Sequence, residues 1–268
     1  MFKFQDYGFD KVVILHLIED TKRKDFIEWQ LDRLGIDKNS IEWHIAVKHP
    51  FGYELTMGFN SVNAHYMQNE NRFIGKFTKA NEISCLREHY TIVKKAYYEG
   101  ANKLLVLEDD IRFNKDIEFL KSYMSNIPED ADFLQGDCFT ANNEISPKLK
   151  ESRKTDEAKW ILHVGIGLWT ASFISYNRKA MKFFLDYIDT YYMPADMPVF
   201  AAAQNESEKY NCYVSKYPLV FQENCSEIPS NIRSEQLQTY YQDEANLYLD
   251  GVNKDDYFSY KSYQKQIN

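Results

Sequence analysis

The chain has 268 residues, of which 44% are hydrophobic and 27% are charged. This mixture excludes a disordered or low-complexity protein, because enough apolar side chains are present to bury a core. The 10 glycines and 7 prolines are spread along the chain without a hinge-like cluster, so we expect one main globular domain.

The net charge of −8 results from 32 basic and 40 acidic residues, and neither sign is concentrated in one block. A broad nucleic-acid-binding surface is therefore disfavoured, although a local basic pocket for a phosphate remains open. The first residues lack the basic start and apolar stretch of a secretion signal, and every apolar run is far shorter than the roughly 20 residues that cross a membrane. We expect a cytoplasmic protein without a transmembrane segment.

The four cysteines, Cys85, Cys138, Cys212 and Cys225, form no Cys-x-x-Cys pair and have no regular spacing. This pattern predicts neither a zinc site nor a disulfide framework. We interpret them as reduced thiols in a cytoplasmic protein, with a single bridged pair as the alternative.

The first fifty residues have the order strand, helix, strand. Residues 12–17 are a short β-branched run. We expect Asp20-Thr21 to cap the helix that follows, which ends before Gly35. Residues 41–47 have the pattern of a second strand. This order favours a mostly parallel central sheet flanked by helices, and hence an α/β fold.

A long irregular segment at 48–78 precedes a helix at 79–98, whose apolar residues recur every three or four positions. Gly100 ends that helix. The apolar run at 103–107 then predicts a strand buried on both faces, and the acidic triplet 108–110 follows it directly.

The remainder of the chain alternates short strands and helices, and its tail is rich in Tyr, Gln and Asp. We expect a domain over 1–233 and a C-terminal extension over 234–268 that packs on it or is mobile. The polar residues 140–159 predict a loop. The other expected elements are helices at 115–126, from Asn177 and at 194–203, and strands at 132–135, 160–164, 169–175 and 212–221.

The acidic triplet Glu108, Asp109 and Asp110 is the feature with the clearest chemical consequence. Three adjacent carboxylates repel one another, and the carboxyl edge of a parallel sheet is where such folds bind ligands. A hard divalent ion such as Mg²⁺, Mn²⁺ or Ca²⁺ would relieve the repulsion, taking one or two carboxylates together with phosphate oxygens. The alternative is that the three side chains face solvent and one of them caps the next turn.

Several motifs, in the same order along the chain, resemble glycosyltransferase family 25, the bacterial lipopolysaccharide-type family that also contains relatives of the collagen galactosyltransferases. The resemblance covers roughly residues 11–232. It is carried by the helix with Arg23 after the first strand, by Glu82, Cys85 and His89 in the segment 82–89, by the acidic strand end at 105–111, and by the segments 169–183, 194–196 and 217–222.

The resemblance implies a GT-A-like nucleotide-sugar-binding fold and a divalent cation, Mn²⁺ or Mg²⁺. It also implies inverting transfer of galactose or glucose from a UDP-sugar to a saccharide acceptor in cell-surface polysaccharide or lipopolysaccharide synthesis. By matching position, Asp110 would be the main metal ligand. Glu108 and Asp109 would orient the metal or contact the ribose and sugar of the donor. Such acceptors lie at membranes, so the resemblance also implies a peripheral membrane contact, which we expect to form through the C-terminal tail.

Three further residues are candidate catalytic groups. Asp196 stands between two prolines and is the candidate general base, with a helix N-cap as the alternative. Glu82 and His89 are seven residues apart, which places them two turns apart on one helix face. They would line a cleft, with Cys85 between them, or else form a buried polar stripe.

The end of the first strand supplies candidate nucleotide contacts. His16 and Leu17 lie where backbone groups of this fold meet the nucleotide, and Arg23 could face the phosphates. The alternative for Arg23 is a solvated position on the helix surface.

Two other classes of function remain open. One is a metal-dependent phosphohydrolase or nucleotidyltransferase, although the chain has neither a P-loop nor a Gly-x-Gly-x-x-Gly turn. The other is a non-catalytic sugar-nucleotide-binding relative, since Asn81, Ser84 and Glu88 stand where the family often has Gly, Gly and Ser.

Overall fold

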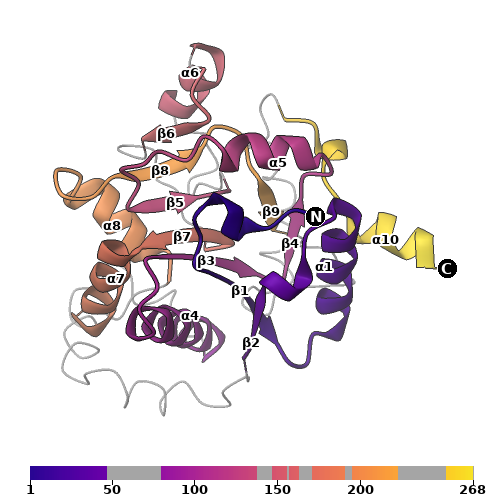
Figure 1. Cartoon of the computed structure of the whole chain (residues 1–268), viewed down its shortest axis with the longest axis horizontal. Helices are drawn as coiled ribbons and strands as arrows, with labels where there is room; N and C mark the ends of the chain where they lie inside the picture. The colour runs from indigo at the N-terminus through magenta and orange to yellow at the C-terminus, as the bar shows by residue number, and fades with distance from the viewer. Residues whose placement is uncertain are drawn as a thin grey trace.

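A computed structural model describes most of the chain (Figure 1). The expected irregular segment 48–78 lies outside the described part, as do Cys138 and Cys225. The described residues are 1–46, 80–137, 147–155, 157–162, 171–190, 195–222 and 252–267.

A seven-stranded sheet in the order β2-β1-β3-β7-β5-β8-β6 forms the centre of the described structure. Five of its strands run in one direction, and only β6 and β7 are antiparallel to their neighbours. The expected α/β fold is therefore confirmed, with a mixed sheet in which most strands share one direction. The strands are β1 (Lys11–Leu17), β2 (Glu42–Ala46), β3 (Lys103–Glu108), β5 (Phe133–Gln135), β6 (Trp160–Leu162), β7 (Phe173–Asn177) and β8 (Cys212–Ser215).

Helices cover both faces of this sheet. Figure 1 shows α4, α7 and α8 on one side and α1 and α5 on the other. The helices are α1 (Thr21–Leu34), α4 (Ala80–Tyr98), α5 (Ile117–Met124), α6 (Pro147–Thr155), α7 (Arg178–Thr190), α8 (Met197–Asn205) and α10 (Tyr260–Ile267), and short 3-10 turns lie at Phe4–Tyr7, Lys38–Ser40 and Lys254–Asp256.

Strand alternation explains why the apolar runs are continuous. In β3, Leu105 packs in the same core as α1 and α5, whereas its neighbour Leu104 packs in the core formed with α4 and α7. Ile14 and Val13 divide between the two cores in the same way in β1. Because successive side chains point to opposite faces, a strand covered on both sides is apolar at every position.

A second, two-stranded sheet pairs β4 (Ile111–Phe113) with β9 (Val220–Gln222) in antiparallel fashion. The expected single strand over 212–221 is therefore wrong, since β8 and β9 belong to different sheets. Pro218 lies between them and cannot donate a ladder hydrogen bond. The pairing of Ile111 with Gln222 brings a distant segment beside the acidic triplet.

Two other expectations differ from the structure. The segment 140–159 contains helix α6, so it is not simply a loop. Asp20 occupies the N-cap position of α1, but its side chain accepts no capping hydrogen bond. Asn177 does cap a helix, because its Oδ1 accepts a 2.8 Å hydrogen bond from the amide of Ala180 in α7.

The C-terminal described segment contacts helix α1 through aromatic rings. Phe26 and Tyr260 are 5.5 Å apart between ring centroids, and Trp29 and Phe258 are 5.0 Å apart.

Within the described residues, no helix combines the length and apolar character that crossing a bilayer requires.

Candidate functional site

The candidate site lies where β1 and β3 end side by side. The two strands are parallel, and their register pairs Leu15 with Glu108. The residues after this pair, His16 and Leu17 on β1 and Asp109 and Asp110 after β3, therefore meet at the carboxyl edge of the sheet. This is the edge at which open α/β sheets bind their ligands.

Asp109 is the buried centre of this arrangement, with 4% of its surface exposed. One carboxylate oxygen lies 2.7 Å from His16 Nδ1 and accepts a 3.4 Å hydrogen bond from the amide of Leu17. The other oxygen accepts a 3.0 Å hydrogen bond from Arg23. Both oxygens of Asp109 are thus engaged by protein groups, which fixes β1, α1 and the end of β3 together.

Arg23 is a buried counter-charge, since only 6% of its surface is exposed. Its guanidinium lies 3.6 Å from Asp110 and 3.7 Å from Asp20, in addition to the contact with Asp109. Desolvation by itself would lower the pKa of Arg23, but the negative charges of Asp110, Asp109 and Asp20 outweigh it and raise that pKa. The alternative of a solvated surface arginine is therefore wrong.

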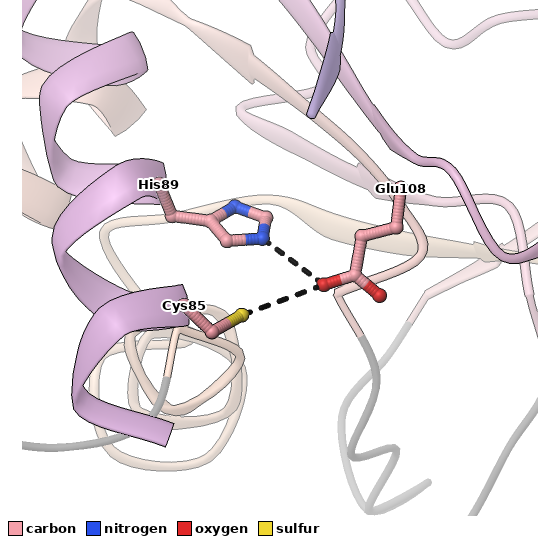
Figure 2. A group of neighbouring side chains, drawn as sticks. All are labelled: Cys85, His89 and Glu108. Carbon is pink, nitrogen blue, oxygen red and sulfur yellow. Dashed lines mark hydrogen bonds and ion pairs between the residues drawn. The ribbon is translucent and has the colours of Figure 1, made fainter. Parts of the chain in front are cut away.

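Glu108 points away from Asp109 and toward helix α4. Figure 2 shows His89 and Cys85, one helical turn apart, directed at the same oxygen of Glu108. The distances to that oxygen are 3.2 Å from His89 Nε2 and 3.7 Å from Cys85 Sγ. The other oxygen accepts a 3.1 Å hydrogen bond from Gln222 Nε2.

These contacts determine whether the carboxyl group of Glu108 is ionised. Desolvation would raise the pKa of Glu108, but it is outweighed by the hydrogen bond and charge of His89, the hydrogen bond from Gln222 and the charge of Arg23. The pKa of the carboxyl group is therefore lowered, and Glu108 is ionised at neutral pH. His89 is completely buried, so it contacts this carboxylate from inside the protein.

The surroundings of Cys85 show that the site carries negative charge. Desolvation and the charges of Glu108, Asp110 and Asp196 raise the pKa of the Cys85 thiol well above its usual value. Desolvation followed by the charges of Asp196 and Glu108 also raises the pKa of Tyr176 on β7. Asp196 therefore acts on the same group of side chains as Glu108 and Asp110.

Asp196 immediately precedes helix α8, at its N-cap position. Its side chain accepts no capping hydrogen bond, so the alternative that it serves only as a helix cap is not supported. Its side chain is half-buried. A carboxylate that does not cap its helix, in electrostatic contact with Cys85, suits a role in the site.

Some residues of the site could be expected from the sequence and others could not. Glu82 lies in α4 two turns before His89, and its side chain is outside the described part of the structure. The contact of Cys85 and His89 with one partner follows from their four-residue spacing on a helix. Gln222 has no comparable signal, because its position depends on the pairing of β9 with β4.

An α/β sheet with an acidic motif at its carboxyl edge is typical of proteins that bind nucleotides, and it agrees with the GT-A-like fold that the sequence predicts. Residues 9–199 match the family described as glycosyltransferase family 25 (LPS biosynthesis protein). The chain therefore belongs to glycosyltransferase family 25, as its motifs indicate.

Two curated relatives come from the same family. The chain is 20% identical over 216 residues to the "probable inactive glycosyltransferase 25 family member 3" of Bos taurus, with 77% of this chain and 34% of that protein covered. It is 20% identical over 176 residues to the Homo sapiens "inactive glycosyltransferase 25 family member 3", with 62% of this chain and 27% of that protein covered. The chain thus spans about a third or less of these relatives.

Solved structures show a distant likeness in fold. The glycosyltransferase GlyE of Streptococcus pneumoniae is 10% identical with a TM-score of 0.40, covering 94% of this chain and 65% of its own. Mouse xyloside xylosyltransferase 1 is 10% identical with a TM-score of 0.38, covering 82% and 99%. The mannosyltransferase PcManGT of Pyrobaculum calidifontis, solved with GDP-Man and Mn²⁺, is 9% identical with a TM-score of 0.38, covering 80% and 63%.

Proposed function

We propose that the chain transfers a hexose, galactose or glucose, from a UDP-sugar to a saccharide acceptor with inversion, and that it depends on Mn²⁺ or Mg²⁺. The observation that carries the proposal is the acidic triplet at the carboxyl end of β3 in a chain of glycosyltransferase family 25. The description of that family supports an acceptor in lipopolysaccharide or cell-surface polysaccharide synthesis.

The donor set of the site fits a hard divalent ion. Both carboxylate oxygens of Asp109 are already hydrogen-bonded, to His16, Leu17 and Arg23. We therefore assign the ion to Asp110, with Glu108 beside it. The charges that raise the pKa of Cys85 show that this region is negative, which favours a cation. One or two carboxylates, completed by phosphate oxygens, suit Mg²⁺ or Mn²⁺. When bound, the ion would supply Lewis-acid stabilisation of the diphosphate leaving group.

The other residues would position the donor and move the proton. Arg23 holds Asp109 and Asp110 in place by its charge. The carboxyl end of β1, at His16 and Leu17, would contact the nucleotide. Asp196 would accept the proton of the acceptor hydroxyl as it attacks the anomeric carbon. His89, being completely buried, would contribute by orienting Glu108. We keep Glu82 as a candidate for the acceptor side.

Transfer assays test this proposal directly. We expect release of UDP from UDP-galactose or UDP-glucose in the presence of Mn²⁺ and a lipopolysaccharide core acceptor, and its loss in Asp110→Asn. The matched control is Asp186→Asn, which removes an exposed carboxylate paired with Lys182 on α7. Release of inorganic phosphate would instead indicate a phosphohydrolase. Transfer of the uridylyl group, with the sugar 1-phosphate as leaving group, would indicate a nucleotidyltransferase.

The names of the two mammalian relatives, both described as inactive, favour one alternative, a non-catalytic sugar-nucleotide-binding protein. Under this alternative the chain would bind UDP and Mn²⁺ but release no UDP from any UDP-sugar.

For location, we propose a cytoplasmic protein with a peripheral contact to the membrane that carries the acceptor. Sedimentation with vesicles of bacterial lipid extract tests that contact.

A further inference from the structure

Cys85, His89 and Glu108 form a group of metal-ligating atoms. In the proposed transfer reaction Glu108 and His89 only support the ligand Asp110, and Cys85 has no role. Their Sγ, Nε2 and carboxylate oxygen all lie within 4.8 Å of one another. We propose that these three side chains bind a second divalent ion, of the zinc class, next to the hard-ion site assigned to Asp110. This inference does not depend on the chain being a transferase.

The spacing of the ligands already approaches that of a tetrahedral site. Zn–N, Zn–O and Zn–S bonds of about 2.0–2.3 Å imply ligand separations of roughly 3.4 Å for N···O and 3.6 Å for S···O. The observed separations are 3.2 Å between His89 Nε2 and Glu108 Oε1, and 3.7 Å between Cys85 Sγ and the same oxygen. An ion could therefore replace the two hydrogen bonds with small movements of these side chains.

The helix supplies two of the ligands in a suitable arrangement. Cys85 and His89 are four residues apart in α4, so their side chains lie one above the other on one face. Figure 2 shows both directed toward Glu108 at the end of β3. An ion held by all three would link α4 to β3 through the Glu108 carboxylate.

The chemistry of the three ligands selects a zinc-class ion. A thiolate, an imidazole and one carboxylate are a mixed set that suits Zn²⁺ or Co²⁺, whereas Mg²⁺ takes oxygen ligands. Three protein ligands leave a fourth position for water. Gln222 donates to the other oxygen of Glu108 and would act as the outer partner that orients this ligand.

Binding requires a defined movement of protons. The ion displaces the proton of the Cys85 thiol, which leaves to solvent. It also displaces the proton between His89 Nε2 and Glu108, which leaves to solvent as well. The imidazole then keeps its other proton on Nδ1, a nitrogen that has no hydrogen-bond partner among the described residues. The charges of Glu108, Asp110 and Asp196 oppose a bare thiolate and favour a cation bound to it.

Cobalt titration of the full chain, stripped of metal with EDTA, tests the proposal. We expect one equivalent of Co²⁺ to produce a thiolate-to-cobalt charge-transfer band in the near ultraviolet, and Zn²⁺ to abolish it by competition. Cys85→Ser should lose the band and His89→Gln should weaken cobalt binding at least tenfold. Gln222→Ala should weaken binding by about 10–100-fold.

Two controls separate this site from the others. Cys212→Ser removes the other described cysteine, a buried residue of β8, and should keep the band. Asp110→Asn should keep it too, even though it is expected to lose UDP release, so failure of either proposal is recognised separately. Circular dichroism verifies that each variant is folded. The proposal is overturned if the folded wild-type chain shows no charge-transfer band, or if the band survives in Cys85→Ser.

Discussion

Replacing Arg23 by methionine removes the counter-charge of the acidic motif while keeping much of the side-chain volume. The guanidinium is 3.0 Å from Asp109 and 3.6 Å from Asp110, and only 7% of the Arg23 side chain is exposed, so solvent screens these contacts little. Removing one partner of a buried ion pair costs about 3–5 kcal/mol, because the remaining charge stays buried. His16 and Leu17 still donate to Asp109, so we expect a loss near the lower end, about 3 kcal/mol.

Urea unfolding at pH 7, followed by tryptophan fluorescence, measures this loss as a change in the free energy of unfolding. The matched control is Lys182→Met, which breaks the ion pair with Asp186. The side chains of Lys182 and Asp186 are 58% and 62% exposed. That control should lose less than about 0.5 kcal/mol. A loss in Arg23→Met of below about 1 kcal/mol, similar to an exposed pair, would show that Arg23 does not neutralise the motif.

Three further predictions concern the packing of Gly136, which directly follows strand β5, and the roles of Glu108 and Asp196 in the site. Gly136→Ala places a Cβ 2.4 Å from the ring of Phe173, so urea unfolding should show a loss of about 1–3 kcal/mol, and wild-type stability would contradict the packing. Glu108 has a lowered pKa in the folded state, so its contribution is lost as the pH falls; Glu108→Gln should flatten the acid limb of the stability curve, and an unchanged limb would contradict this. Asp196→Asn should keep UDP binding by calorimetry but slow transfer by about 10²–10⁴-fold, and unchanged transfer would exclude the base role.

Local patterns in the sequence predict the elements that are buried or amphipathic over several residues. The continuous apolar run before Glu108 indicates a strand covered on both faces, which is what the alternation of Leu104 and Leu105 between two cores produces. The helix before Gly100 follows from its regular apolar spacing, and both elements are where the pattern places them.

Short elements and long-range contacts are not encoded in this way. Strands β4 and β9 have three residues each, too few to show a period, and exist because they pair with each other. The burial of Arg23 depends on three carboxylates from two segments, so its helix alone predicts a solvated side chain. The contact of Gln222 with Glu108 spans 114 positions and follows only from the second sheet.

The proposed function depends most on Asp110 holding a cation that in turn holds the diphosphate of the donor. Isothermal titration calorimetry of UDP with the wild-type chain and Asp110→Asn, each with Mn²⁺ and with EDTA, measures this directly. We expect UDP to bind the wild-type chain only with Mn²⁺, and the variant at least tenfold more weakly. Equal binding with EDTA, or equal binding by the variant, would contradict the proposed function.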